Sequence, residues 1–207
     1  MKVRVKICGI TCPDDAAAAI DAGADLIGLN FVPGTPRALE LGQAAAVSER
    51  AAGQVERVAV FRDADPYDLD RILRRVEVER VQLHGDEEPD DAEQLDLPVI
   101  KALRGADEIA AARYPGCILL LDHPSEGGGR GQTWSWAEAE PLIAAGYDII
   151  LAGGLDPERV GEALANVGDI LPWGVDVATG VEQEPGHKDP AKMRAFVEAV
   201  RRIEEAS

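Results

Sequence analysis

The feature that most constrains this chain is a series of apolar runs at fairly regular intervals, each followed by a polar or alanine-rich segment with a helical pattern. The runs cover residues 3–7, 25–31, 55–61, 76–83, 97–103, 117–121, 147–151 and 170–175. Several lack a clean alternation of apolar and polar residues, as expected of parallel strands that helices cover. Eight β-then-α units without a composition break predict an α/β fold, a single-domain (β/α)8 barrel over residues 1–207.

The helical segments carry clear start signals. Asp65-Pro66, Asp156-Pro157 and Asp189-Pro190 each place an N-cap acid before a proline at the first helical position. Ser135 and Glu138 have the spacing of a capping box. The predicted helices cover residues 14–22, 41–52, 66–75, 106–112, 136–145, 157–165 and 190–204, with a weaker acidic one at 86–94. The alternative fold, an open doubly wound sheet, lacks its Gly-x-Gly-x-x-Gly fingerprint after the first run.

The charge balance narrows the choice of partners. Acids number 38 against 21 bases, a formal net charge of −17, which argues against a nucleic-acid or anionic-membrane partner. No stretch has the apolar length of a membrane helix or of a signal-peptide core. Cys8, Cys12 and Cys117 are too few for a disulfide framework, and their spacing does not fit a zinc site. We expect a cytoplasmic protein without a bound metal.

The basic residues are mostly arginine, and the lysines are Lys2, Lys6, Lys101, Lys188 and Lys192. An acidic, lysine-poor chain suggests adaptation to a high-salt cytoplasm, where screening relieves self-repulsion. An ordinary soluble acidic domain explains the same composition.

In a barrel, chemistry collects where strands end, on the loops that lead into the helices. Cys8 ends the first predicted strand and Asp122 ends the sixth. A thiolate can take a proton from carbon, and a carboxylic acid can protonate a departing oxygen, so this pair suits the isomerisation of a sugar. The competing interpretations are a small buried hydrophobe for Cys8 and a loop cap for Asp122.

Glycines follow the last two strands. Gly153 and Gly154 come after the seventh, and Ala178, Thr179 and Gly180 form a turn after the eighth. Such loops expose backbone N–H groups, and a short helix beginning near Ala178 would add its positive end, so a phosphorylated small molecule is the predicted ligand.

Three other strand-end residues are candidates. Arg37, in a stiff loop with two prolines, suits a carboxylate or is an ordinary surface arginine. His84 is a site residue or a hydrogen-bonded structural group, and Asp176 reaches the site or braces its own loop. Trp134 and Trp136 start a helix and are expected to pack on the barrel wall.

Taken together, these residues resemble one family, phosphoribosylanthranilate isomerase of tryptophan biosynthesis. The matching segments run in order along the chain: KICGIT at 6–11, PR at 36–37, VQLHG at 81–85, LLLD at 119–122, GQTWSW at 131–136, LAGGLDPERV at 151–160, GVDVATGVE at 174–182 and PGHKD at 185–189. The resemblance implies a compact (β/α)8 barrel, which agrees with the pattern of runs.

The resemblance also implies an Amadori rearrangement of N-(5-phosphoribosyl)anthranilate to 1-(2-carboxyphenylamino)-1-deoxyribulose 5-phosphate, with no metal or organic cofactor. In the family's scheme Asp122 protonates the ring oxygen, Cys8 removes the C2 proton and Arg37 binds the anthranilate carboxylate. The loops after strands seven and eight hold the phosphate. These roles require a raised pKa for Asp122 and a positive group or hydrogen-bond donor near Cys8. We expect a monomer or a homodimer.

Two positions depart from the family pattern: Ala178 replaces the first serine of the phosphate turn, and Arg130 stands in the glycine run after the sixth strand. Related barrels fit less well. The histidine-pathway isomerase would have an acid where this chain has Cys8, and indole-glycerol-phosphate synthase would have a catalytic lysine and glutamate on the early strands. A barrel that only binds a ligand would not need an acid, a thiol and an arginine on three loops.

Overall fold

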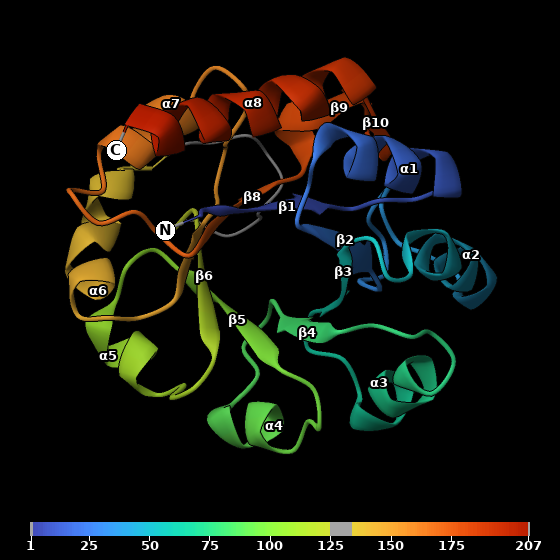
Figure 1. Cartoon of the computed structure of the whole chain (residues 1–207). Helices are drawn as coiled ribbons and strands as arrows, with labels where there is room; N and C mark the ends of the chain where they lie inside the picture. Colours follow the sequence, from blue (N-terminus) through green and yellow to red (C-terminus); the bar gives the residue numbers. More distant parts are fainter. Residues whose placement is uncertain (1, 125–133, 207) are drawn as a thin grey trace.

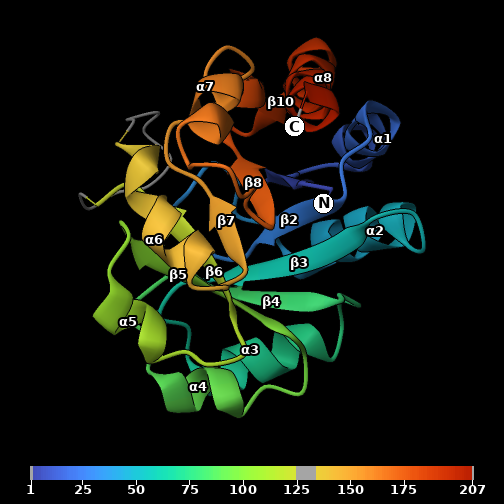
Figure 2. The same cartoon turned by 60° about the vertical axis from the view of Figure 1, so that its left-hand side comes forward.

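A computed structural model describes residues 2–124 and 134–206. Parallel strands pair in chain order into a closed barrel, which helices surround (Figures 1 and 2). The strands are β1 (Arg4–Cys8), β2 (Leu26–Asn30), β3 (Glu56–Phe61), β4 (Arg80–Leu83), β5 (Val99–Arg104), β6 (Ile118–Asp122), β7 (Ile149–Leu151) and β8 (Gly174–Val177). Pairing of β1 with β8, with Val5 opposite Val175, closes the ring. The predicted (β/α)8 fold is confirmed.

The outer layer consists of helices and one small hairpin. The helices are α1 (Pro13–Ala22), α2 (Leu41–Ala51), α3 (Pro66–Leu73), α4 (Pro89–Glu93), α5 (Glu108–Ala112), α6 (Glu140–Ala144), α7 (Val160–Ala165) and α8 (Pro190–Ala206). Single 3-10 turns, η1 (Trp136–Ala139) and η2 (Thr179–Val181), precede α6 and follow β8. Strands β9 (Glu182–Glu184) and β10 (His187–Lys188) form an antiparallel hairpin that the sequence did not predict. No helix in the described ranges is both long and apolar enough to cross a membrane.

Two of the three helices predicted to begin at an Asp-Pro pair start directly after the aspartate, and the third starts later. Asp65 accepts from the Tyr67 amide at 2.9 Å and begins α3, and Asp189 accepts from the Ala191 amide at 2.8 Å and begins α8. Asp156 also caps, accepting from the Arg159 amide at 2.8 Å, but residues 157–159 form a turn and α7 starts only at Val160.

Other predicted elements are shorter or divided. The predicted helix 136–145 divides into η1 and α6, and the capping box is wrong because the Ser135 side chain makes no capping bond. Strand 76–83 is wrong over its first half: the Val76 amide still bonds to Ile72 O at 2.9 Å, at the end of α3, and its side chain is buried without joining the ladder. Helix 86–94 shrinks to Pro89–Glu93, since the Glu87 carboxylate accepts from Lys101 and the Gly85 amide.

The core has two layers, one between strands and helices and one inside the barrel. Val5 and Ile7 of β1 pack in the outer layer with residues of α1 and α8, whereas Cys8 packs inside with Leu26 and Ile150. The alternation of β1 therefore sends its apolar face toward the helices and its charged face, with Lys6, into the barrel.

Ion pairs and cation–π contacts fill the N-terminal end of the barrel. Arg4 and Arg80 bind opposite oxygens of Glu56 at 2.7 and 2.6 Å, and their guanidinium carbons lie 4.8 and 5.7 Å from the Trp173 ring centroid. The far, C-terminal end of the barrel is left for the functional side chains.

Candidate active site

One cavity at the C-terminal ends of the strands gathers nearly all the predicted site residues. This central cavity is lined by Cys8, Arg37, His84, Asp122, Gly153, Gly154, Asp176, Ala178 and Thr179, together with Asn30, Val32, Thr35, Val60, Arg62, Gln82, Ala152, Leu155 and Val177. Gly180 is absent from the lining. The structure therefore brings the sequence candidates from several strands and their loops to one place.

Cys8 is at the end of β1 and is 9% exposed. Its neighbour across the ladder is Gly28, where an added Cβ would lie 2.7 Å from the Cys8 Sγ. Gly9 follows with φ 75°, a left-handed conformation that glycine adopts without strain. The missing side chain at Gly28 is what leaves room for the thiol inside the barrel.

Positive groups surround this thiol, as its proposed role requires. Lys6, 1% exposed and two residues earlier on the same face of β1, binds Asp176 at 2.7 Å. Lys188, from the β10 strand, donates to Ala178 O at 3.0 Å and to Glu182 at 2.9 Å. Burial raises the pKa of the Cys8 thiol, and the charge of Lys6 opposes that shift. Asp176 raises the pKa further, and Lys188 lowers it, so the net shift is upward.

Arg37 makes an internal ion pair. Its Nε and Nη2 each donate to a Glu182 oxygen at 2.7 Å, and Glu182 also receives Lys188. Burial favours the neutral acid, but these contacts hold the pKa of Glu182 below its usual range. Two of the three guanidinium nitrogens are therefore engaged by Glu182, and Nη1 has no hydrogen bond to the described residues.

Asp122 is 16% exposed and lies beside His84. Its Oδ2 is 3.3 Å from His84 Nε2, its Oδ1 accepts from the His123 amide at 2.8 Å, and His84 Nδ1 lies 2.7 Å from Gln82 Nε2. Burial would raise the pKa of Asp122, yet His84 and the His123 amide outweigh burial and hold it below its usual range. The expectation of a raised pKa for this acid is therefore wrong for this structure.

The loops after β7 and β8 touch through their backbones. A Cβ at Gly180 would lie 2.1 Å from Leu155 O, so only glycine permits this approach. The helix expected near Ala178 is only the single turn η2, because β9 begins at Glu182. The predicted glycine run 126–132, with Arg130, lies outside the described residues.

Comparison with known proteins assigns the family. The model of the N-(5'-phosphoribosyl)anthranilate (PRA) isomerase family matches residues 5–199. An isomerase of that name from Pseudomonas fluorescens is 46% identical and aligns over 99% of this chain and 98% of its own. The chain belongs to the phosphoribosylanthranilate isomerase family. Crystal structures of family members agree: the Thermus thermophilus enzyme has a TM-score of 0.88 at 39% identity, covering 97% of this chain and 100% of that one.

Another PRA isomerase structure holds a reduced form of 1-(o-carboxyphenylamino)-1-deoxyribulose 5-phosphate. It has a TM-score of 0.85 at 32% identity and covers 96% of this chain and 98% of its own. The similarity thus extends over nearly the whole barrel.

Four charged residues of this family member were missed by sequence reasoning. Lys6, Lys188 and Glu182 lie within the matching segments but had no role, and Arg62, the residue after β3, was not considered. The position of Lys6 was available from its spacing, since residues i and i+2 of a strand share a face, here with Cys8. Within the described ranges, no group of three or more His, Cys, Asp or Glu is arranged to hold a metal ion.

Trp134 and Trp136 pack on the barrel wall as predicted. Both are buried, and both indole nitrogens donate to Ala152 O, at 3.1 and 3.0 Å. Ala152 directly precedes Gly153, so the two rings hold the start of the β7 loop.

Proposed function

We propose that this chain catalyses the aldose-to-ketose rearrangement of N-(5'-phosphoribosyl)anthranilate to 1-(2-carboxyphenylamino)-1-deoxyribulose 5-phosphate, a step of tryptophan biosynthesis. The observation that carries the proposal is the meeting of Cys8, Asp122 and the two glycine loops in one cavity. An acid and a base on β6 and β1 reach a sugar whose phosphate lies at β7 and β8.

The first step needs a proton at the furanose ring oxygen. Asp122 delivers it as the C1–O bond breaks and the nitrogen lone pair forms the C1=N bond of a Schiff base. The substrate brings a phosphate and a carboxylate into the cavity, and these negative charges favour the neutral acid over the ionised one. His84 Nε2 lies 3.3 Å from Asp122 Oδ2 and is the side-chain nitrogen placed to pass a proton to that carboxylate.

Gln82 suits both states of that ring. As placed, its Nε2 donates to Nδ1 of neutral His84. Its Oε1 is buried and has no partner among residues 2–124 and 134–206. With the amide turned over, Oε1 accepts from an Nδ1–H of His84, so Gln82 holds the ring in the same orientation in either tautomer.

The second step removes the C2 proton. The Cys8 thiolate takes it, and the C2 electron pair neutralises the iminium to give an enolamine. Tautomerisation then adds a proton at C1 and removes the proton of the C2 hydroxyl, which yields the ketone. The positive charges of Lys6 and Lys188 stabilise the thiolate. Backbone N–H groups of the β7 and β8 loops, with Thr179, bind the phosphate, and Ala178 contributes no hydroxyl there.

We infer that the whole chain is one catalytic domain working in the cytoplasm without a cofactor. Its large exposed apolar side chains among the described residues, Tyr67, Ile109 and Ile170, stand on three separate parts of the fold. These three side chains form no contiguous apolar surface within residues 2–124 and 134–206, which favours the monomer over the homodimer. Light scattering after gel filtration measures the mass.

The deciding experiment is a steady-state assay of the purified protein with phosphoribosylanthranilate. Cys8→Ser and Asp122→Asn should each lower kcat by about a hundredfold or more while circular dichroism stays unchanged. Near-wild-type rates in both variants would refute the acid–base assignment, and no turnover by the wild type would refute the function itself.

A further inference from the structure

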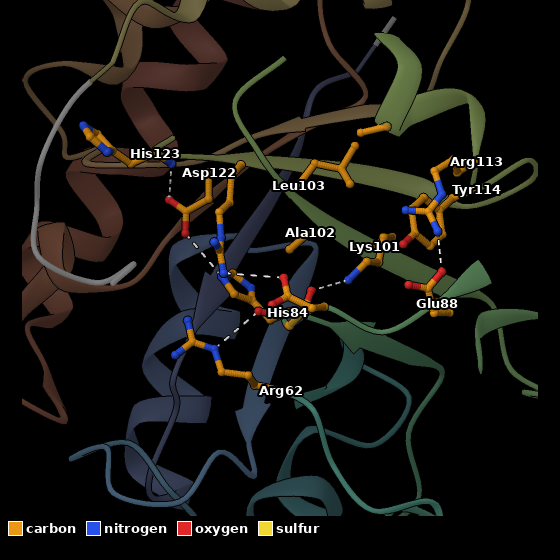
Figure 3. A pocket seen from close by; sticks show the side chains of 14 residues that line it. Arg62, His84, Glu88, Lys101, Ala102, Leu103, Arg113, Tyr114, Asp122 and His123 are labelled. Atoms are coloured by element: carbon orange, nitrogen blue, oxygen red, sulfur yellow. Dashed lines mark hydrogen bonds and ion pairs between the residues drawn. The ribbon is translucent and has the colours of Figure 1, made fainter. Parts of the chain in front are cut away.

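Arg62 differs from the other arginines at this end of the barrel. It follows β3 and lines both the central cavity and a neighbouring side cavity, which is bounded by Lys101, Arg104, Arg113 and Tyr114 (Figure 3). Arg37 is paired with Glu182, Arg113 with Glu88, and Arg104 lies 3.5 Å from Asp86. No carboxylate in the described ranges lies within ion-pair distance of Arg62, whose Nε donates a long hydrogen bond, 3.4 Å, to His84 O.

Arg50, Arg75, Arg194 and Arg202 also lack an ion pair within the described ranges, but none of them lines either cavity. The neighbouring arginines are paired with carboxylates, whereas Arg62 lies beside His84 and bonds only to its backbone oxygen within the described ranges (Figure 3). Its fork of N–H donors, largely unengaged by the described residues, is suited to a carboxylate that arrives with a ligand.

The position of Arg62 in the ring fixes which end of the substrate it meets. In the closed order of eight strands, β3 lies opposite β7. A substrate with its phosphate at the β7 and β8 loops and its sugar between Cys8 and Asp122 extends its aromatic acid toward β2, β3 and β4. Arg37 offers one remaining guanidinium nitrogen there, since Glu182 holds the other two.

We propose that Arg62 binds the anthranilate carboxylate of the substrate, next to Arg37, and is the residue by which the enzyme distinguishes an ortho-carboxylated aniline from aniline itself. This assignment rests on the proposed function. Arg62 thus acts in substrate selection, while Asp122 and Cys8 carry the chemistry.

The test compares two ligands on four proteins. The ligands are the stable reduced product, 1-(2-carboxyphenylamino)-1-deoxyribitol 5-phosphate, and its counterpart without the carboxylate. The proteins are the wild type, Arg62→Gln, Arg62→Lys and Arg104→Gln, the last a matched loss of one charge at the neighbouring end of β5 that lines only the side cavity. Calorimetry gives Kd for each pair, and steady-state assays with phosphoribosylanthranilate give kcat and KM.

Loss of a charge-assisted hydrogen bond at an accessible site should raise Kd for the carboxylated ligand and KM about tenfold in Arg62→Gln. Binding of the carboxylate-free ligand and kcat should stay near wild type. Arg62→Lys should recover part of the affinity, and Arg104→Gln should keep the wild-type discrimination between the ligands.

Equal weakening of both ligands in Arg62→Gln, an equal effect in Arg104→Gln, or a fall in kcat without a rise in KM would overturn the assignment. A wild type that isomerises phosphoribosylanthranilate while Arg62→Gln keeps full discrimination refutes this inference alone. A wild type without turnover refutes the proposed function.

Discussion

The ionisation of Cys8 depends on a few buried charges. Lys6 and Lys101 are both almost fully buried lysines, each 2.7 Å from a carboxylate, Asp176 in one case and Glu87 in the other. Lys6 alone of these two lies next to the thiol. The pair therefore allows the effect of charge on Cys8 to be separated from the general cost of breaking a buried ion pair.

Replacing Lys6 by methionine should move the pH profile. The pKa of Cys8 is already above its ordinary value, and a base below its pKa loses activity with its ionised fraction. Removing the cation raises that pKa further, so the rising limb of kcat/KM against pH should move to higher pH. Activity at neutral pH should fall about tenfold if the pKa of the thiol rises by about one.

Lys101→Met is the matched control. It should lose comparable thermal stability but keep the wild-type dependence of kcat/KM on pH. If kcat/KM of Lys6→Met rises over the same pH range as in the wild type, this lysine does not stabilise the Cys8 thiolate.

Single residues show where sequence reasoning succeeds and where it stops. Cys8 and Asp122 were predictable because the strand-end rule needs only the order of elements. The lowered pKa of Asp122 was not, because it depends on His84, which is 38 positions away in sequence and adjacent only in the closed barrel. Arg62 directly follows β3 and was not among the candidates from the sequence.

Element boundaries failed where an apolar residue is buried for another reason. Val76 is buried at the end of α3, and Trp173 covers two arginines before β8, so both extended the predicted strands beyond their ladders. Burial and strand pairing give the same sequence signal, and only the tertiary contacts separate them.

The contact between the β7 and β8 loops gives an element-level prediction. Gly180→Ala places a Cβ 2.1 Å from Leu155 O, so one backbone must retreat, at about 1–3 kcal/mol of unfolding free energy. Since these loops are the proposed phosphate site, KM should rise about tenfold with kcat less affected. Gly42→Ala, in α2 with open space around it, should leave both parameters unchanged. If KM of Gly180→Ala stays at the wild-type value, the backbone contact between the β7 and β8 loops is not needed for substrate binding.

The two ends of the chain are joined through Asp25. It accepts from Lys2 Nζ at 2.5 Å, from the Val5 amide at 2.9 Å and from Arg201 of α8 at 2.8 Å, and Figure 1 shows α8 crossing beside α1. Burial favours the neutral acid, but these donors hold the pKa of Asp25 below its ordinary value. The folded chain therefore binds this proton less tightly than the unfolded chain.

Asp25→Asn should cost about 1–2 kcal/mol of unfolding free energy at pH 7. Because the folded pKa is depressed, that contribution exists above the unfolded pKa, about 4, and disappears as pH falls through the folded value. Urea titrations at pH 7 and pH 3 should show the gap between wild type and variant narrowing in acid. If the difference in unfolding free energy between wild type and variant is the same at both pH values, it comes from packing and not from the charge of Asp25.

The whole surface is more acidic and poorer in lysine than composition indicates. Of the five lysines, Lys6, Lys101 and Lys188 are buried, so only Lys2 and Lys192 are exposed. If this is adaptation to salt, the melting temperature should rise between low and molar potassium chloride as self-repulsion is screened. A flat melting temperature over that range would leave an ordinary acidic enzyme.

The paired indoles have a consequence for watching the enzyme work. Trp134 and Trp136 hold Ala152 O at the start of the β7 loop, whereas Trp173, the third tryptophan of the chain, stacks with Arg4 and Arg80 at the opposite end. Indole emission depends on its immediate surroundings, so the native fluorescence contains one signal from the C-terminal end of the barrel and another from its N-terminal end. Ligand binding at the proposed phosphate loop and unfolding at the N-terminal end of the barrel can therefore be followed separately in the unlabelled protein, by replacing either the Trp134–Trp136 pair or Trp173.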